Sequence, residues 1–276
     1  KRQRIMIECT AKIKASNNIV MEKDYTTIDH HNKIKHLLET TIKRQSFFLV
    51  AQPIVSTDGQ KKYYEILSRM RTESDQILYP DTFLPIAKWA GLLHSLDKAV
   101  IKQTFKFICQ SSETHSDSCF SINLTPETLC CVNFIKFIKD EIKKNKIKPE
   151  RIVFEVIETE ALDKNDIIEI INKIREIGCK IAIDDFGSGH SNYERLRNLN
   201  IDLLKIDGSF IKNILVNDFD RSAVKSFCEI AKIKNAKVVA EFVENGEVME
   251  FLMSLGIDFF QGYYTGKPVA LENIYL

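Results

Sequence analysis

From about residue 46 onward, short β-branched or aromatic runs alternate with longer amphipathic stretches. Eight of the short runs are predicted strands: Phe48–Ser56, Lys62–Arg69, Phe120–Leu124, Arg151–Glu158, Lys180–Phe186, Leu203–Phe210, Lys237–Glu244 and Phe259–Gly262. Predicted helices lie between most of them, at 98–110, 127–144, 163–176, 218–233 and 246–255. Strands that alternate with helices are typical of parallel βαβ units. Eight strands in 276 residues favour a closed barrel, which needs about 250 residues.

The connection between the first two strands departs from a regular barrel. Only Thr57–Lys61 separates them, and this segment contains Asp58-Gly59. So short a connection joins antiparallel strands, because parallel strands need a crossover of a dozen residues or more. We therefore predict an α/β fold, a modified TIM (β/α)8 barrel with an antiparallel first strand pair.

The first residues differ in pattern from the barrel. We expect residues 1–32 to be the tail of an upstream domain and a connector, and residues 33–276 to form the barrel domain. Lys1 is not an initiator methionine, so we expect the chain to be a piece of a longer protein. A lead-in helix is predicted by apolar residues at spacings of three and four: Ile34, Leu37, Leu38 and Ile42.

Composition excludes several classes of protein. The 39 basic and 38 acidic side chains leave a net charge of +1, without the basic excess of a duplex nucleic-acid binder. No apolar run reaches the roughly 18 residues of a membrane span, and the N-terminus lacks the apolar core of a secretory signal. The seven cysteines include no C-x-x-C pair, which argues against a disulfide framework or a structural zinc site. We expect a cytoplasmic fragment that makes no membrane contact.

Acidic and amide side chains gather where the predicted strands end. They are Glu65, Asn123, Glu155, Glu158, Asp184, Asp185, Asp207, Glu241, Glu244 and Gln261. A single acid at a strand end is most simply a surface salt bridge. Because six successive strands end this way, and active sites of barrels lie at the carboxyl ends of the strands, we interpret the set as an active site.

Crowded carboxylates need cations. Two of them about 4 Å apart repel by about 4 kcal/mol at an effective dielectric constant of 20. Lys205 is the one basic residue placed among them. Oxygen ligands suit hard ions, so the pattern indicates Mg2+ or Mn2+. Asp185-Phe186-Gly187 also resembles a protein-kinase triplet, but no G-x-G-x-x-G loop precedes a V-A-I-K strand.

These motifs, in order, resemble those of the EAL domain family of cyclic di-GMP phosphodiesterases. The resemblance covers residues 48–268 and rests on Gln52-Pro53-Ile54, Tyr64–Arg69, Ser121–Leu124, Phe154–Glu158, Asp184–Gly189, Leu204–Asp207 and Gln261–Tyr263. It implies hydrolysis of cyclic di-GMP to linear pGpG, with two metal ions activating a bridging water. Residues before 46 weakly resemble the tail of a GGDEF domain, which implies an upstream regulatory domain.

The resemblance also implies metal ligands. Those of the first ion are Glu65, Asn123, Glu155 and Asp184. Asp184 bridges to the second ion, which Asp185 also holds. Glu241 completes the shell of metal and water and helps to deprotonate the water. Mg2+ or Mn2+ supports the reaction in this family, and Ca2+ inhibits it.

Further roles follow from the same resemblance. Lys205 holds or polarises the attacking water, and Asp207 orients Lys205 or a water on the metal. The residues implied to contact the substrate are Gln52, Leu67, Arg69, Asp97 and Gln261. Glu244 supports the network together with Gln261. Glu158 anchors the loop Phe186–Arg195, which positions the paired aspartates.

One residue departs from the family pattern at a sensitive place. Phe242 stands beside Glu241 where the family usually has glycine. Strand alternation predicts that its side chain points away from Glu241, towards the outer helices. If it displaces Glu241 by an ångström, the rate can fall about 100-fold.

Two other functions stay open at this stage. The chain could be a catalytically inactive receptor that binds cyclic di-GMP and signals to a protein partner. Such receptors typically lose metal ligands or the lysine, all of which are present here. A bare interaction module is disfavoured by the intact acid cluster. By analogy with the family, we expect a homodimer.

Overall fold

In a computed structural model, eight strands close into a barrel. The structure describes residues 29–59, 62–111, 117–158, 165–188 and 193–274. The ring runs β1 (Phe48–Ser56), β2 (Lys62–Arg71), β4 (Cys119–Asn123), β5 (Ile152–Ile157), β6 (Lys180–Phe186), β7 (Leu203–Ile206), β8 (Lys237–Ala240) and β9 (Phe259–Gln261). Pairing of β9 with β1 closes it, which confirms the predicted barrel.

β1 runs against every other strand of the ring. It pairs antiparallel with β2, with Gln52 opposite Glu65, and antiparallel with β9. The remaining ring pairs are parallel. The hairpin turns at Gly59, whose φ of 66° lies in the left-handed region that glycine adopts freely. The predicted antiparallel first pair is therefore confirmed.

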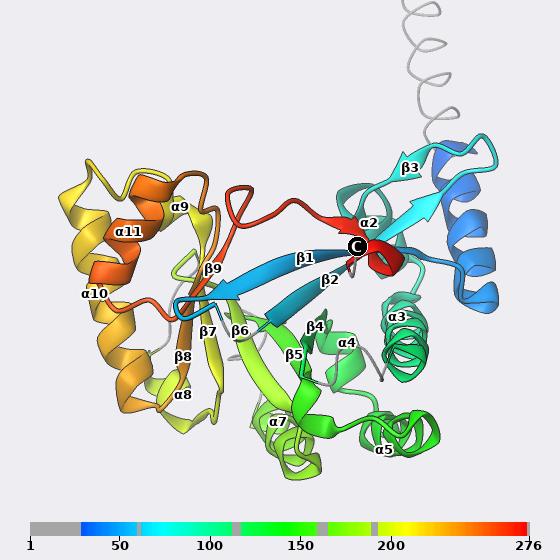
Figure 1. The fold of residues 1–276 in the computed structure, drawn as a ribbon. Coiled ribbons are helices and arrows are strands. Elements are labelled where there is room, and N and C mark those ends of the chain that lie inside the picture. The colour runs from blue at the N-terminus through cyan, green and yellow to red at the C-terminus, as the bar shows by residue number, and fades with distance from the viewer. Residues whose placement is uncertain (1–28, 60–61, 112–116, 159–164, 189–192, 275–276) are drawn as a thin grey trace, which may run out of the picture.

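Helices surround the ring of strands (Figure 1). The crossover helices are α3 (Leu93–Gln110), α5 (Phe134–Asn145), α7 (Asn165–Ile177), α10 (Asp218–Ile233) and α11 (Gly246–Ser254). The other helical segments are α2 (Pro80–Trp89), α4 (Pro126–Leu129), α8 (Tyr193–Asn198), α9 (Gly208–Ile211), η1 (Pro149–Arg151) and η2 (Leu271–Asn273). Short strands β3 (Ile77–Leu78) and β10 (Val269–Ala270) pair with the outer parts of β2 and β1. None of the described helices is long and apolar enough to cross a membrane.

The barrel interior has an apolar layer and a polar layer. The apolar layer is one cluster of buried residues, Ile54, Tyr63, Cys119, Val153, Ala182, Leu203, Val239 and Phe259. On each strand the polar residue lies two positions away: Glu155 follows Val153, and Lys205 follows Leu203. Side chains two apart share a face of a strand, so the polar residues form the next layer, towards the carboxyl ends of the parallel strands.

Two predicted strands were too long. The strand expected at Leu203–Phe210 ends at Ile206, and α9 begins at Gly208. The strand expected at Lys237–Glu244 ends at Ala240. The helix expected at 127–144 is divided into α4 and α5. In each case apolar residues continue along the sequence beyond the point where the backbone turns. The spacing of apolar residues therefore does not show where the strand or helix ends.

The lead-in helix lies beside the barrel. Residues 29–44 are helical, and Ile34 and Leu38 are buried in the main hydrophobic core. The assignment of residues 1–32 to an upstream domain and connector falls almost entirely on residues 1–28, outside the described residues.

Candidate active site

Lys205 is the centre of the polar layer. It extends from β7 and is 1% exposed. Its Nζ lies 2.8 Å from a carboxylate oxygen of each of Glu155, Asp184 and Glu241, and 3.6 Å from Glu65. These acids come from four strands or their carboxyl ends, so the barrel brings together residues that are up to 176 positions apart (65 to 241). One cation thus faces four carboxylates.

Amide side chains continue the network towards β1. Asn123 Nδ2 donates to Glu65 Oε1 at 2.9 Å. Gln261 Nε2 donates to Glu65 Oε2 at 2.5 Å and lies 3.3 Å from Gln52 Oε1. The cross-strand pairing of Gln52 with Glu65 explains how the antiparallel strand contributes to this layer. These donors orient the Glu65 carboxylate without adding charge.

Burial disfavours the charged form of two of these acids, Glu155 and Glu241. Burial raises the pKa of Glu155 well above its ordinary value, against the attraction of Lys205. Burial likewise raises the pKa of Glu241 to about 8. Burial alone would lower the pKa of Lys205, but Asp184, Glu155 and Glu241 raise it well above its ordinary value. Lysine therefore stays charged, and the cluster as a whole has a deficit of positive charge.

The donor set fits divalent cations. Carboxylate oxygens of Asp184, Asp185 and Glu241 all lie within 4.8 Å of one another. Glu155 Oε1 and Gln261 Oε1 are buried and accept no hydrogen bond from any described residue. Buried acceptors without a donor are costly, and a hard cation would satisfy them. The residues present therefore fit Mg2+ or Mn2+.

The segment after β6 is held from two sides. Asp185 adopts a φ of 54° and Gly187 a φ of 96°. Glu158 Oε2 accepts the backbone N–H of Gly187 at 2.9 Å. A Cβ at Gly187 would lie 2.6 Å from the ring of Phe210, so only glycine fits there. Glu158 thus contacts the start of the loop that it was expected to anchor; residues 189–192 lie outside the described part of the chain.

A cavity of about 420 Å3 opens above the acids. Its walls include the site residues Gln52, Glu65, Leu67, Arg69, Asp184, Glu241, Glu244 and Gln261. Phe242 and Tyr263 also line it. Glu65, Leu67 and Arg69 lie two apart on β2, and they line this cavity together, as strand alternation predicts. The Arg69 guanidinium lies 4.8 Å from the ring centre of Tyr79.

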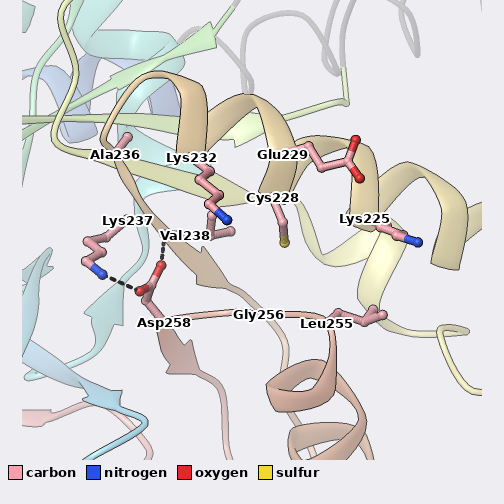
Figure 2. A pocket seen from close by; sticks show the side chains of 10 residues that line it. All are labelled: Lys225, Cys228, Glu229, Lys232, Ala236, Lys237, Val238, Leu255, Gly256 and Asp258. Atoms are coloured by element: carbon pink, nitrogen blue, oxygen red, sulfur yellow. Dashed lines mark hydrogen bonds and ion pairs between the residues drawn. The ribbon is translucent and has the colours of Figure 1, made fainter.

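A somewhat larger cavity, about 460 Å3, lies at the other end of the barrel strands. Figure 2 shows its mixed lining, in which Asp258 accepts from Lys237 and from the backbone of Val238. Lys237 begins β8 and Asp258 precedes β9, so this cavity is at the amino ends. Residues at that end of a barrel generally serve stability, and we assign the chemistry to the smaller cavity.

Asp97 lies apart from the acid cluster. It is buried on α3, and its Oδ2 accepts from Thr125 N, Thr125 Oγ1 and Thr128 Oγ1. Burial raises its pKa to about 6. It lines a cavity of about 380 Å3 together with Leu67 and Asn123. The structure therefore places Asp97 at a neighbouring cavity and not among the residues that line the cavity above the acids.

Two residues have surroundings that the sequence did not predict. Asp207 Oδ1 accepts a hydrogen bond from Ser209 N and caps α9. Within the described part of the chain, Lys205 forms its ion pairs with other acids. The ring of Phe242 lies against a helical segment, at Gly208 of α9, but its backbone was not predicted. Phe242 follows the end of β8 with a φ of 54°, is half exposed and lines the 420 Å3 cavity. Strand alternation fails there because residue 242 is no longer in a strand.

Comparison with known proteins gives a consistent result. The family model of the EAL domain matches residues 35–268. "Cyclic di-GMP phosphodiesterase PdeF" of Escherichia coli K12 is 44% identical over 85% of this chain and 31% of its own length. "Cyclic di-GMP phosphodiesterase PdeB" of Shewanella oneidensis is 32% identical over 95% of this chain and 32% of its own length. The chain thus spans about a third of these relatives.

Solved structures agree with the fold. The PaMucR phosphodiesterase in a c-di-GMP complex superposes with a TM-score of 0.81 at 26% identity, over 88% of this chain and 99% of that one. The FimX EAL domain of Pseudomonas aeruginosa bound to c-di-GMP gives a TM-score of 0.79 at 25% identity, over 85% and 96%.

Proposed function

The chain belongs to the EAL domain family, and on that premise we propose that it hydrolyses cyclic di-GMP to linear pGpG in a metal-dependent reaction. The product would be a dinucleotide with a 5′ phosphate, and the reaction would lower the level of the cyclic messenger. The observation that carries the proposal is the buried Lys205 facing four carboxylates, with acceptor atoms that no described residue satisfies.

Metal ions would complete this arrangement. Glu65, Asn123, Glu155 and Asp184 would hold the first ion, and Asp184, Asp185 and Glu241 the second. Two bound Mg2+ or Mn2+ ions would lower the pKa of a water between them and offset charge on the phosphodiester. Ca2+, which accepts looser and larger coordination, is expected to inhibit.

Side chains of the chain itself would orient the attacking water and transfer its proton. Lys205 Nζ would donate to the attacking water or to a phosphoryl oxygen, where negative charge develops. A Glu241 carboxylate oxygen would take the proton of the water. The water oxygen would bond to phosphorus as the bond to the ribose 3′ oxygen breaks. The 3′ oxygen would then take up the proton that Glu241 received, and Glu241 would return to its starting state. Glu244 would support this network from the cavity wall, and Asp207 through its cap of α9.

Substrate binding falls to the cavity walls. Arg69 would pair with a phosphate, while Gln52, Leu67 and Gln261 fix the ribose and base from the neighbouring strands. Asp97 would contact the substrate from its adjoining cavity. Glu158 would hold the paired aspartates in register through Gly187.

Product analysis tests the proposal. The chain is incubated with cyclic di-GMP and Mg2+ or Mn2+, and pGpG is sought by chromatography. Glu65→Ala and Asp184→Asn should each abolish turnover. The matched control is Glu229→Gln, an exposed acid of the amino-end cavity, which should keep it. Turnover that survives both site variants would refute the metal site. Binding without any product would instead support a receptor that signals to a partner.

A further inference from the structure

Phe242 is held in a conformation that its residue type disfavours. Its φ of 54° lies in the left-handed region, which glycine adopts without a steric clash. Backbone hydrogen bonds on both sides of Phe242 hold this conformation. Glu241 N donates to Ile206 O, and Val243 N donates to Gln261 O. The chain is thus fixed to β7 on one side of Phe242 and to β9 on the other. A glycine would make the same turn with less strain.

Burial of the Phe242 side chain in the hydrophobic core does not offset this backbone strain. It is 50% exposed, whereas the adjacent Val243 is fully buried. The ring instead lies against Gly208 of α9, where an added Cβ would be 2.1 Å from Phe242 Cδ2. Lys212 Nζ lies 4.4 Å from the centre of the ring. These two contacts fix where the ring stands.

The ring is half exposed and stands at the cavity of the candidate active site. Phe242 lines the same cavity as Arg69, Asp184 and Glu241. An aromatic surface beside a site for a phosphodiester suits a nucleobase, because every base has a face that stacks on an aromatic ring. We propose that Phe242 is a specificity-determining residue that stacks on one base of the cyclic dinucleotide. This inference rests on the proposed function and names the subsite that holds the base.

Binding and turnover of Phe242 variants test the inference. For Phe242→Gly, the KM for cyclic di-GMP with Mg2+, and the Kd measured by calorimetry with Ca2+, should rise about 5- to 100-fold, the effect of one lost base stack. The kcat should change little. Phe242→Tyr keeps the aromatic face and should bind like the wild type, and Phe242→Leu should be intermediate.

Thermal unfolding separates binding from a structural role. Glycine relieves the strain at this position, so the metal-free Phe242→Gly variant should melt no lower than the wild type. A residue that served only packing would give the opposite result. Phe219→Ala, which removes a 73% exposed ring on α10, is the matched control and should leave KM unchanged.

A double-mutant cycle locates the effect at the ring. Gly208→Ala should displace the ring and raise KM in the wild-type background, but add nothing in the Phe242→Gly background. Two results overturn the inference alone: a wild type that hydrolyses cyclic di-GMP with Phe242→Gly binding equally well, or a fall in kcat with KM unchanged. A wild type that neither binds nor hydrolyses the dinucleotide overturns the proposed function as well.

Discussion

At the scale of single residues, the site is defined by one buried lysine among several buried acids. The strand pattern predicted that these acids lie close together, because strand alternation and the carboxyl-end rule apply to each strand separately. It did not predict the cap that Asp207 forms on α9 or the position of Phe242. Both depend on the residue at which a strand ends. A turn of one or two residues does not alter the spacing of apolar residues in the sequence, so it cannot be predicted from that spacing.

Removal of the Lys205 charge should harm both folding and turnover. In Lys205→Met, the acids around it lose the lysine with which they form ion pairs, and an unpaired buried charge costs about 3–5 kcal/mol. Urea unfolding without metal should show this loss, and Mg2+ should restore part of it. The rate should fall about 100-fold or more, as when one donor to a developing oxyanion is removed.

Lys237→Met is the matched control for this variant. Lys237 pairs with Asp258 at 2.7 Å, but its side chain is 65% exposed. Exposed pairs contribute about 1 kcal/mol or less, so this variant should unfold close to the wild type. Equal losses for the two lysine variants would contradict the central place given to Lys205.

Stability should depend on pH through Glu241. Burial raises its folded-state pKa to about 8, whereas the ordinary value is 4.5. Between these values the folded chain holds a proton that the unfolded chain has lost, so stability falls as pH rises. The metal-free protein should therefore melt lower at pH 8.5 than at pH 5.

Metal binding should reduce this pH dependence, since Mn2+ displaces the proton, and Mn2+ affinity should itself rise with pH. Melting curves in EDTA and in Mn2+ across the pH range provide the measurement. Asp97 adds a slope of the same sign at lower pH, because burial raises its pKa to about 6. Glu241→Gln should flatten the curve between pH 6 and 8.5. A curve as steep as that of the wild type would show that another group is responsible.

At the scale of elements, strands were easier to predict than the segments that follow them. β1, β6 and α10 have the predicted bounds, since each is a long run with one period. The ends of β7 and β8 were missed, and both lie at the mouth of the site. There the backbone departs from strand geometry to turn side chains towards the cavity, and tertiary contacts decide where it does so.

Gly187→Ala tests whether the segment after β6 is fixed by its neighbours. A Cβ there would lie 2.6 Å from the Phe210 ring and 3.1 Å from the Phe227 ring. The paired aspartates would shift, and a displacement of about 1 Å can cost about 100-fold in rate. Steady-state kcat for cyclic di-GMP is the measurement.

Gly256→Ala separates crowding from backbone strain. Gly256 has a similar φ of 90°, but a Cβ there would meet nothing within 4 Å. This control should lose about 1–2 kcal/mol of stability from the left-handed backbone and keep its kcat. A normal kcat for Gly187→Ala would mean that the loop tolerates displacement.

At the scale of the whole molecule, the barrel was predictable because its order of elements is regular. The closing pair of β1 with β9 was predicted only as the closure of a ring of eight strands. Its register, such as Ile54 opposite Gln261, was not predicted, since it joins segments about 200 residues apart. The two layers of the barrel interior follow from its closure. Once the ring of strands forms, apolar side chains fill one end of the interior, and the polar side chains two residues away on each strand fill the other end. The sequence therefore predicted that the acids gather at one end of the barrel, but not the shape of the cavity above them.

Leu38→Ala tests whether residues 29–44 are part of the same cooperative unit. Leu38 is fully buried in the main core, so truncation should cost about 2–5 kcal/mol. Lys33→Ala on the same helix removes an exposed side chain and should cost about 0.5 kcal/mol or less. A single urea transition that shifts for Leu38→Ala alone is the expected result. An unshifted transition would show that the helix is not part of the folded unit.

The isotope content of the product tests the central claim most directly. Cyclic di-GMP is incubated with the chain and Mn2+ in water enriched in oxygen-18, and the product is analysed by mass spectrometry. We predict pGpG with one oxygen-18 atom on its 5′ phosphate, formed with Mn2+ and absent in EDTA. Unchanged cyclic di-GMP, a product with a 3′ phosphate, or pGpG formed equally in EDTA would contradict a metal-dependent attack of water on phosphorus.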